Sequence, residues 1–394
     1  MCLAHEVDKQ ASRHRRNVHR RRRTASSPAT VFSRILLAIA TIVILRWAWF
    51  PRSSSSPANI AYFIQVSPET VLHLPRLLRV LHHPKNVYLV HFDIKIPASL
   101  ISRAQTFLQS NSYKKNVFVL PQEAIAYAGI SMLLNTINAI SEALRYNWDF
   151  FINLSGTDYP LLNPDRIRSF LGRADVLGRR LNFLQAQEAD KDKEWFVNKR
   201  LGRIYIDTTL HSKASQNDGT LIDLNTSSPY NFSDVTFVKS EGWVILHRSF
   251  CEYAVNSASG RRLLLSYATA RAADELFFGA LLSEGDEFRR TMTWDSFRFI
   301  KWGLHGTRWS RPGYLDEIDE EIREELRESG AFFARKFRNC ESELKDFIDE
   351  NMSGMAQRAY GVNDSSVAEF AQKAETRLHR ATAVQSVTAG HFQV

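Results

Sequence analysis

The stretch IAYFIQVSPETVLHLPRLLRVLHHPKNVYLVHFDIK, residues 60–95, decides the fold class of this chain. Apolar runs at 60–66 and 86–93 predict two buried strands, and leucines at helical spacing predict a helix over 69–83 between them. Pro75 lies near the start of that helix, where a missing N–H is tolerated. A strand, a helix and a second strand in this order predict a βαβ unit with parallel strands.

The same alternation of short apolar runs and amphipathic stretches continues along the chain. Further strands are predicted at 116–120, 147–156 and 235–250, and further helices at 100–110, 130–146 and 268–284. The polar stretch 189–233 is predicted to be an inserted loop region. We therefore predict an α/β domain over 60–350, in which helices flank a mixed, Rossmann-like sheet, and a loosely ordered tail over 351–394.

The positive charge of the chain is concentrated at its N-terminus. The net charge is +9, and the first fifty residues contain ten Lys and Arg against two acidic residues, which leaves +1 for all the rest. A domain that binds nucleic-acid phosphates over a broad face needs a basic surface, so a nucleic-acid partner is not expected.

Residues 31–50 are predicted to be a membrane anchor. They contain an unbroken apolar run from Ile35 to Leu45, flanked by Arg34 and Arg46 and followed by aromatic residues. The run is shorter than the roughly 20 residues that span a bilayer, but flanking arginines can reach the interface and tryptophans are common there. A cleaved signal peptide and a nuclear localisation signal are the alternatives for this segment.

The basic residues before the apolar run predict the topology. They place residues 1–30 in the cytoplasm and the domain in the lumen of the Golgi or the endoplasmic reticulum, with 51–59 as a Pro/Ser-rich stem. Asn225 and Asn231 lie in N-x-S/T sequons within the polar stretch, so we expect them to be open to glycosylation. Asn153 is also in a sequon, but it lies in a predicted strand and is expected to be buried.

The three cysteines, Cys2, Cys251 and Cys340, match no zinc-binding pattern and cannot form a disulfide framework. Cys251 and Cys340 either pair with each other or are separate thiols, because their distance in sequence does not define their geometry.

Polar residues follow two of the predicted strands. Asp93 closes the second strand, and Asn153, Ser155 and Asp158 close the fourth. Ligands of open α/β sheets bind beyond the carboxyl ends of the strands, so these side chains are candidates for nucleotide or sugar contacts. Helix capping and turn formation are the alternative roles for such residues.

Several stretches together carry a resemblance to a known family. They are 60–95, WDFFINLSGTDYPL at 148–161, SEGWVILHRSF at 240–250, AADELFFGALL at 272–282, FRFIKW at 297–302 and GAFFARKF at 330–337. In order and spacing the chain resembles the core-2/I-branching N-acetylglucosaminyltransferase and peptide O-xylosyltransferase family, glycosyltransferase family 14, which also includes plant glucuronosyltransferases. This resemblance implies a GT-A type fold and an inverting reaction with a UDP-sugar as co-substrate.

The resemblance also implies roles for individual residues. Glu275 is similar in position to the general base of the family, and an inverting transfer needs one such base. The residues implied to bind the nucleotide sugar are Val66, Asp93, Tyr127, Arg335 and Lys336. Those implied to line the donor and acceptor sugars are Asp158, Trp243, Trp302, Trp195, Lys199 and Arg200.

No metal ion or other cofactor is expected. The family that the chain resembles meets the diphosphate with basic side chains, a role that suits the guanidinium of Arg335 and the ammonium of Lys336. The acidic pair Asp190 and Asp192 lies in a polar stretch rather than after a strand, which predicts a solvated loop instead of a metal site.

The stretches RIYIDTTLH and GAFFARKF favour a protein O-xylosyltransferase-like activity. An N-acetylglucosaminyltransferase or a glucuronosyltransferase of the same family is the alternative, and a catalytically inactive sugar-binding scaffold is the alternative from another class. The expected acceptor is a protein or a glycan.

Overall fold

The computed structural model describes residues 56–110, 112–188, 199–210, 219–229, 238–302, 312–316, 320–353, 369 and 372–383. The internal contacts of the chain divide it after Ser54, and every described residue lies in the second unit, Ser55–Val394. The predicted cytoplasmic tail, the anchor and most of the stem lie outside the described residues. Among the helices that are described, none is long and apolar enough to cross a membrane.

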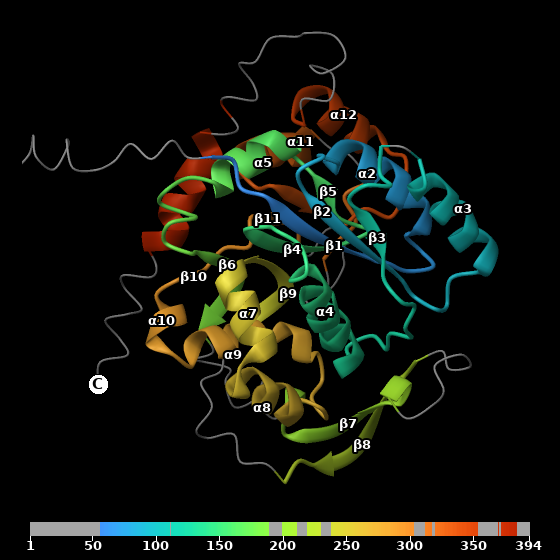
Figure 1. Cartoon of the computed structure of the whole chain (residues 1–394), viewed down its shortest axis with the longest axis vertical. Helices are drawn as coiled ribbons and strands as arrows, with labels where there is room; N and C mark the ends of the chain where they lie inside the picture. The colour runs from blue at the N-terminus through green and yellow to red at the C-terminus, as the bar shows by residue number, and fades with distance from the viewer. Residues whose placement is uncertain are drawn as a thin grey trace, which may run out of the picture. The chain divides into compact units, whose positions relative to one another are not determined.

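A mixed seven-stranded sheet lies at the centre of this unit (Figure 1). Its strands, in spatial order, are β10 (Met292–Thr293), β6 (Asn182–Glu188), β9 (Val238–His247), β4 (Phe150–Ser155), β1 (Ile60–Val66), β2 (Val87–Phe92) and β3 (Val117–Val119). β1 pairs in parallel with β2 and β4, whereas β9 runs antiparallel to β4 and β6. The predicted α/β domain with a mixed sheet is therefore confirmed.

Strand β1 shows how the sequence pattern builds the two layers. Tyr62 and Ile64 belong to the core on one face of the sheet, and Ala61 and Phe63 belong to the core on the other face. Successive side chains of a strand point to opposite faces, so a strand covered on both sides must be apolar throughout.

Helices cover both faces of the sheet (Figure 1). One layer contains η1 (Val71–His73), α2 (Leu74–Leu81), α3 (Ala98–Leu108), α5 (Pro164–Leu171), α11 (Glu320–Ser329) and α12 (Glu343–Asn351). The other contains α4 (Ile130–Ala143), α7 (Arg248–Asn256), α8 (Ala258–Ser266), α9 (Phe277–Ser283) and α10 (Asp286–Arg289). The helix predicted over 69–83 is thus η1 followed by α2, with Pro75 in the first turn of α2.

Two smaller sheets are also present. The first contains β11 (Arg298–Ile300), β12 (Phe333–Arg335) and β5 (Tyr159–Pro160), and the second contains β7 (Arg203–Asp207) and β8 (Leu221–Ser227), with η2 (Thr208–Leu210) after β7. The prediction of a loop region over 189–233 is wrong for the β7–β8 ribbon. Most of β8 is exposed, so it carries no buried face that an alternating apolar pattern would mark.

The helix predicted over 268–284 is wrong in its first half. α9 begins at Phe277 and is preceded by a short 3-10 turn, η4 (Ala273–Glu275). Ala272 has φ of 53°, in the left-handed region, and its N–H donates to the carbonyl of Ala128 at 2.7 Å. This tertiary hydrogen bond replaces the helical one, so Glu275 lies in a turn rather than within a helix.

Part of the tail that was predicted to be loosely ordered is a helix, at 372–383. Ala374 and Leu378, one turn apart, are buried in the core that also covers α11 and α12. Arg377, on the same helix, donates to the carboxylate of Asp295 at 2.7 Å. The apolar stripe is short within a polar, alanine-rich sequence, so its packing partner could not be inferred from periodicity.

Cys251 is buried and Cys340 is partly exposed, and both are free thiols. Of the two alternatives left open by the sequence, the structure has separate cysteines.

Candidate functional site

β1, β2 and β4 run parallel, so their carboxyl ends lie at the same edge of the sheet. This is the edge at which the sequence predicts ligand binding. Val66 ends β1, and its carbonyl accepts a hydrogen bond from the N–H of Asp93 at 3.0 Å. The Asp93 carboxylate accepts from the N–H of Lys95 at 3.0 Å and lies 3.4 Å from its ammonium group. Burial raises the pKa of Asp93, and the contacts with Lys95 oppose this. Val66 is fully covered, and Asp93 has a turn role within the loop after β2.

Asp158, which is predicted to contact a sugar, lies in the turn after β4. Its side chain is buried, and Oδ2 accepts from the N–H of Ser155 at 2.7 Å and from its hydroxyl at 2.8 Å. Oδ1 lies 3.9 Å from the Nε atoms of both Arg298 and Arg335. Asp158 therefore closes the turn after β4 and balances two arginines, since its buried carboxylate needs paired charge.

Arg335, at the end of β12, is the cation that the structure places most clearly in the site. Its guanidinium lies over the ring of Trp243, 4.0 Å from the centroid, in a cation–π contact. Within the described residues its Nε and Nη1 atoms are buried and lack a hydrogen-bond partner. Arg335 and Trp243 were both predicted from the sequence, and the fold brings them together from β12 and β9.

Glu275, the predicted base, lies beside the start of β9. The hydroxyl of Ser240 donates to the carbonyl of Glu275 at 3.2 Å, and the Glu275 carboxylate forms an ion pair with Arg200 at 2.8 Å. The backbone of Arg200 is fixed in turn, because its carbonyl accepts from the N–H of Arg271 at 2.9 Å. The predicted base and a predicted acceptor-binding residue are therefore direct neighbours.

Three further charged residues of the site, Glu241, Asp274 and Arg298, were missed by sequence reasoning. Burial raises the pKa of Glu241 to about 7, although Arg335 and Arg298 oppose this. Burial, followed by the charge of Glu275, also raises the pKa of Asp274 to about 7. Burial lowers the pKa of Arg298 to about 10. Each residue stands within a quoted motif, but only their shared burial in the fold distinguishes them from surface charges.

The remaining predicted residues are more exposed than Arg335 or lie outside the described residues. The Lys336 ammonium lies 4.3 Å from the ring centroid of Tyr314, while Tyr127 and Trp302 have exposed fractions of 77% and 38%. Lys199 is exposed, and its carbonyl accepts from the hydroxyl of Tyr205 at 2.8 Å. Trp195, Asp190 and Asp192 lie outside the described residues.

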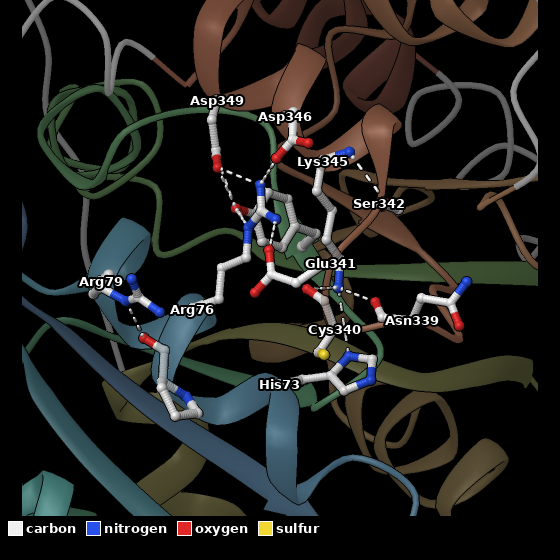
Figure 2. Close-up of polar contacts among 12 residues, drawn as sticks. His73, Arg76, Arg79, Asn339, Cys340, Glu341, Ser342, Lys345, Asp346 and Asp349 are labelled. Atoms are coloured by element: carbon white, nitrogen blue, oxygen red, sulfur yellow. Dashed lines mark hydrogen bonds and ion pairs between the residues drawn. The ribbon is translucent and has the colours of Figure 1, made fainter.

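Helices α2 and α12 hold the chain that follows β12. Figure 2 shows Arg76 of α2 directed toward the carboxylates of Asp346 and Asp349 on α12, to which it donates at 2.7 Å and 2.8 Å. Arg76 also donates to the hydroxyl of Tyr159 at 3.1 Å. Because the guanidinium is mostly buried, this network fixes the position of α12 against α2.

The segment after Arg335 is bound on its carbonyl side by residues of η1 and α12 (Figure 2). Lys345 of α12 is buried and donates to the carbonyl of Asn339 at 2.6 Å. The Nε2 atom of His73 is 3.1 Å from the carbonyl of Arg338. Burial is the main cause that lowers the pKa of His73 to about 4, so its neutral ring donates through Nε2. Arg335 is thus carried by a fixed segment.

Within the part of the chain that the structure describes, no three His, Cys, Asp or Glu side chains are placed to hold a metal ion.

Known proteins resemble this chain over most of its described length. Beta-glucuronosyltransferase GlcAT14A of Arabidopsis thaliana is 29% identical over 308 residues, which cover 76% of this chain and 65% of the relative. The xylosyltransferase of Ciona intestinalis is 25% identical over 317 residues, which cover 76% of this chain and 34% of the relative. The chain therefore spans less than two thirds of the length of these relatives.

Among solved structures, the bifunctional glycosyltransferase WbbM in its apo form aligns with 71% of this chain and 45% of its own, with a TM-score of 0.36 and 9% identity. The family profile of Core-2/I-branching enzymes matches residues 60–326, which is more than half of the chain. This continuous match contains the whole central sheet together with Glu241, Trp243 and Glu275. The chain belongs to the Core-2/I-branching enzyme family.

Proposed function

We propose that this protein is an inverting glycosyltransferase, which moves a sugar from a UDP-sugar to a hydroxyl group of a protein or glycan. One observation carries the proposal: the start of β9 contacts Glu275 through Ser240 and Arg335 through Trp243, and two nitrogens of the Arg335 guanidinium are buried without a hydrogen-bond partner in the described part of the chain. An inverting transfer needs these two groups, a base for the acceptor and a cation for the leaving diphosphate.

In the proposed reaction the acceptor oxygen attacks the anomeric carbon of the donor sugar as its proton passes to Glu275. The bond from the anomeric carbon to the diphosphate oxygen breaks, and the electron pair leaves with UDP. Arg335 stabilises the charge that develops on the diphosphate, with Lys336 as the adjacent second cation. Arg200 orients the Glu275 carboxylate and lies where the acceptor enters. Val66, Asp93 and Tyr127 are proposed to meet the nucleotide, and Trp243 and Trp302 the sugars.

For the donor we favour xylose, which the likeness to the Ciona xylosyltransferase supports. Glucuronic acid is the second candidate. It is supported by the A. thaliana glucuronosyltransferase, which is 29% identical to this chain, compared with 25% for the Ciona xylosyltransferase. N-acetylglucosamine remains the alternative within the family. The reaction is proposed to need no metal, and the predicted N-terminal anchor would hold the enzyme in the Golgi or endoplasmic reticulum membrane with its domain in the lumen.

UDP release by the purified full-length chain tests this proposal. The chain is incubated with UDP-xylose, UDP-N-acetylglucosamine or UDP-glucuronic acid, each with a mixture of peptide and oligosaccharide acceptors. Glu275→Gln keeps the shape of the side chain but removes the base, so turnover should fall on the order of 10² to 10⁴-fold while UDP binding is kept.

Glu284→Gln, an exposed position at the end of α9, is the matched control and should leave turnover unchanged. If Glu275→Gln keeps more than about a tenth of the turnover, the base is a different residue. A scaffold without catalytic activity would bind UDP-sugars and release no UDP with any of them.

A further inference from the structure

Glu241, near the start of β9, is a carboxyl group of the site to which the proposed reaction gives no role. Its Oε2 atom is closed off from solvent and has no hydrogen-bond partner within the described part of the chain. A buried carboxyl oxygen without a partner costs free energy, so such groups are rare unless a ligand completes them.

The position of Glu241 relative to its neighbours shows which ligand atoms it would meet. Ser240, one residue earlier, holds the carbonyl of Glu275. Trp243 follows two residues later, within the irregular part of the β6–β9 pairing, and its ring lies under Arg335. Both Arg335 and Glu275 act electrostatically on the Glu241 carboxyl group. In the proposed reaction the donor sugar lies between the base and the diphosphate, so Glu241 faces that sugar.

An acidic side chain packs directly against this part of β9. A Cβ atom added at Gly242 would lie 2.4 Å from the carboxylate of Asp274, so this acid packs directly against the strand. The acids here also repel one another: in addition to burial, the charges of Glu275 and Asp158 raise the pKa of Glu241, and the charge of Glu275 raises the pKa of Asp274.

We propose that Glu241 selects a neutral donor sugar, a pentose or an N-acetylhexosamine, and disfavours a uronic acid. This inference rests on the proposed function. The hydroxyl groups of a neutral sugar donate to the open Oε2 atom, whereas a uronate brings another carboxylate next to the buried carboxyl group of Glu241.

Donor binding tests the inference without knowledge of the acceptor. The affinities of the full-length chain for UDP, UDP-xylose, UDP-N-acetylglucosamine and UDP-glucuronic acid are measured by calorimetry. A repulsion between buried carboxylates should make UDP-glucuronic acid bind at least about tenfold more weakly than the best neutral donor. In Glu241→Gln that ratio should shrink to about threefold or less, because the charge is removed and the shape is kept.

Glu241→Asp, which retains the carboxyl group, should keep the preference, and Glu321→Gln, an exposed position on α11, is the control for general effects. A merely structural role of Glu241 would weaken all donors in parallel and leave the ratio unchanged, which would overturn the inference. Equal or tighter binding of UDP-glucuronic acid by the natural chain would also overturn it, even if no variant folds. If neither UDP nor any UDP-sugar binds, the proposed function itself fails.

Discussion

Replacing Glu241 by Gln should make the protein more stable at alkaline pH and change its stability little at acidic pH. Burial raises the pKa of Glu241 from 4.5 to about 7 in the folded chain. Between these two values the folded state holds a proton that the unfolded state has lost, so the stability of the natural protein falls as the pH rises through this window.

The size of the effect follows from the shift. A pKa raised from 4.5 to about 7 corresponds to about 3 kcal/mol that the natural protein loses between pH 4.5 and pH 7. Gln keeps the shape of the side chain and does not titrate, so it avoids this loss. Asp274, whose pKa burial also raises to about 7, is present in both proteins, and its contribution cancels in the comparison.

Urea unfolding followed by tryptophan fluorescence at pH 5 and pH 8 measures the difference. The free energy of unfolding of Glu241→Gln minus that of the natural protein should be about 2.5 kcal/mol larger at pH 8 than at pH 5, because part of the total is already lost at pH 5. Glu321→Gln, at an exposed position, should show no such change. If the difference for Glu241→Gln stays within about 0.5 kcal/mol between the two pH values, Glu241 is not a buried carboxyl group of the kind described.

Three other predictions concern the proposed reaction and topology. Arg335→Ala should weaken UDP binding about 10- to 100-fold, because charge-assisted hydrogen bonds to the diphosphate are lost. Arg338→Ala, at an exposed position, is the control and should leave UDP binding unchanged. If calorimetry shows the same loss of UDP affinity in both variants, Arg335 is not the diphosphate ligand. Turnover should survive EDTA, and a loss of activity that Mn²⁺ restores would identify a metal site that we did not expect. Asn225 is exposed on β8, so Asn225→Gln should remove a glycan and increase the mobility of the protein on a gel. The predicted topology would be reversed if glycosidase did not change the mobility of the natural protein and if its C-terminus were accessible to protease from the cytosol.

The sequence by itself was sufficient for five of the seven strands of the central sheet, whereas β6 and β10 were not predicted. Fully buried parallel strands such as β1 and β2 must be apolar at every position, and this local property is visible in the stretches at 60–66 and 86–93. The family motifs likewise predict from the sequence alone that Trp243, Glu275 and Arg335 belong to the site.

Only the tertiary structure decided how these residues are used. The left-handed Ala272 and its hydrogen bond to Ala128 turn a predicted helix into the η4 turn that carries Glu275, and such a contact between distant segments leaves no periodic trace. The two arginines that lie against the carboxylate of Asp158 likewise come from distant segments of the chain, so this contact is not visible in the sequence. A charged residue within a motif looks the same in sequence whether it is solvated or buried. The burial and the neighbouring charges that give Glu241 its chemistry therefore exist only once β9 lies between η4 and β12.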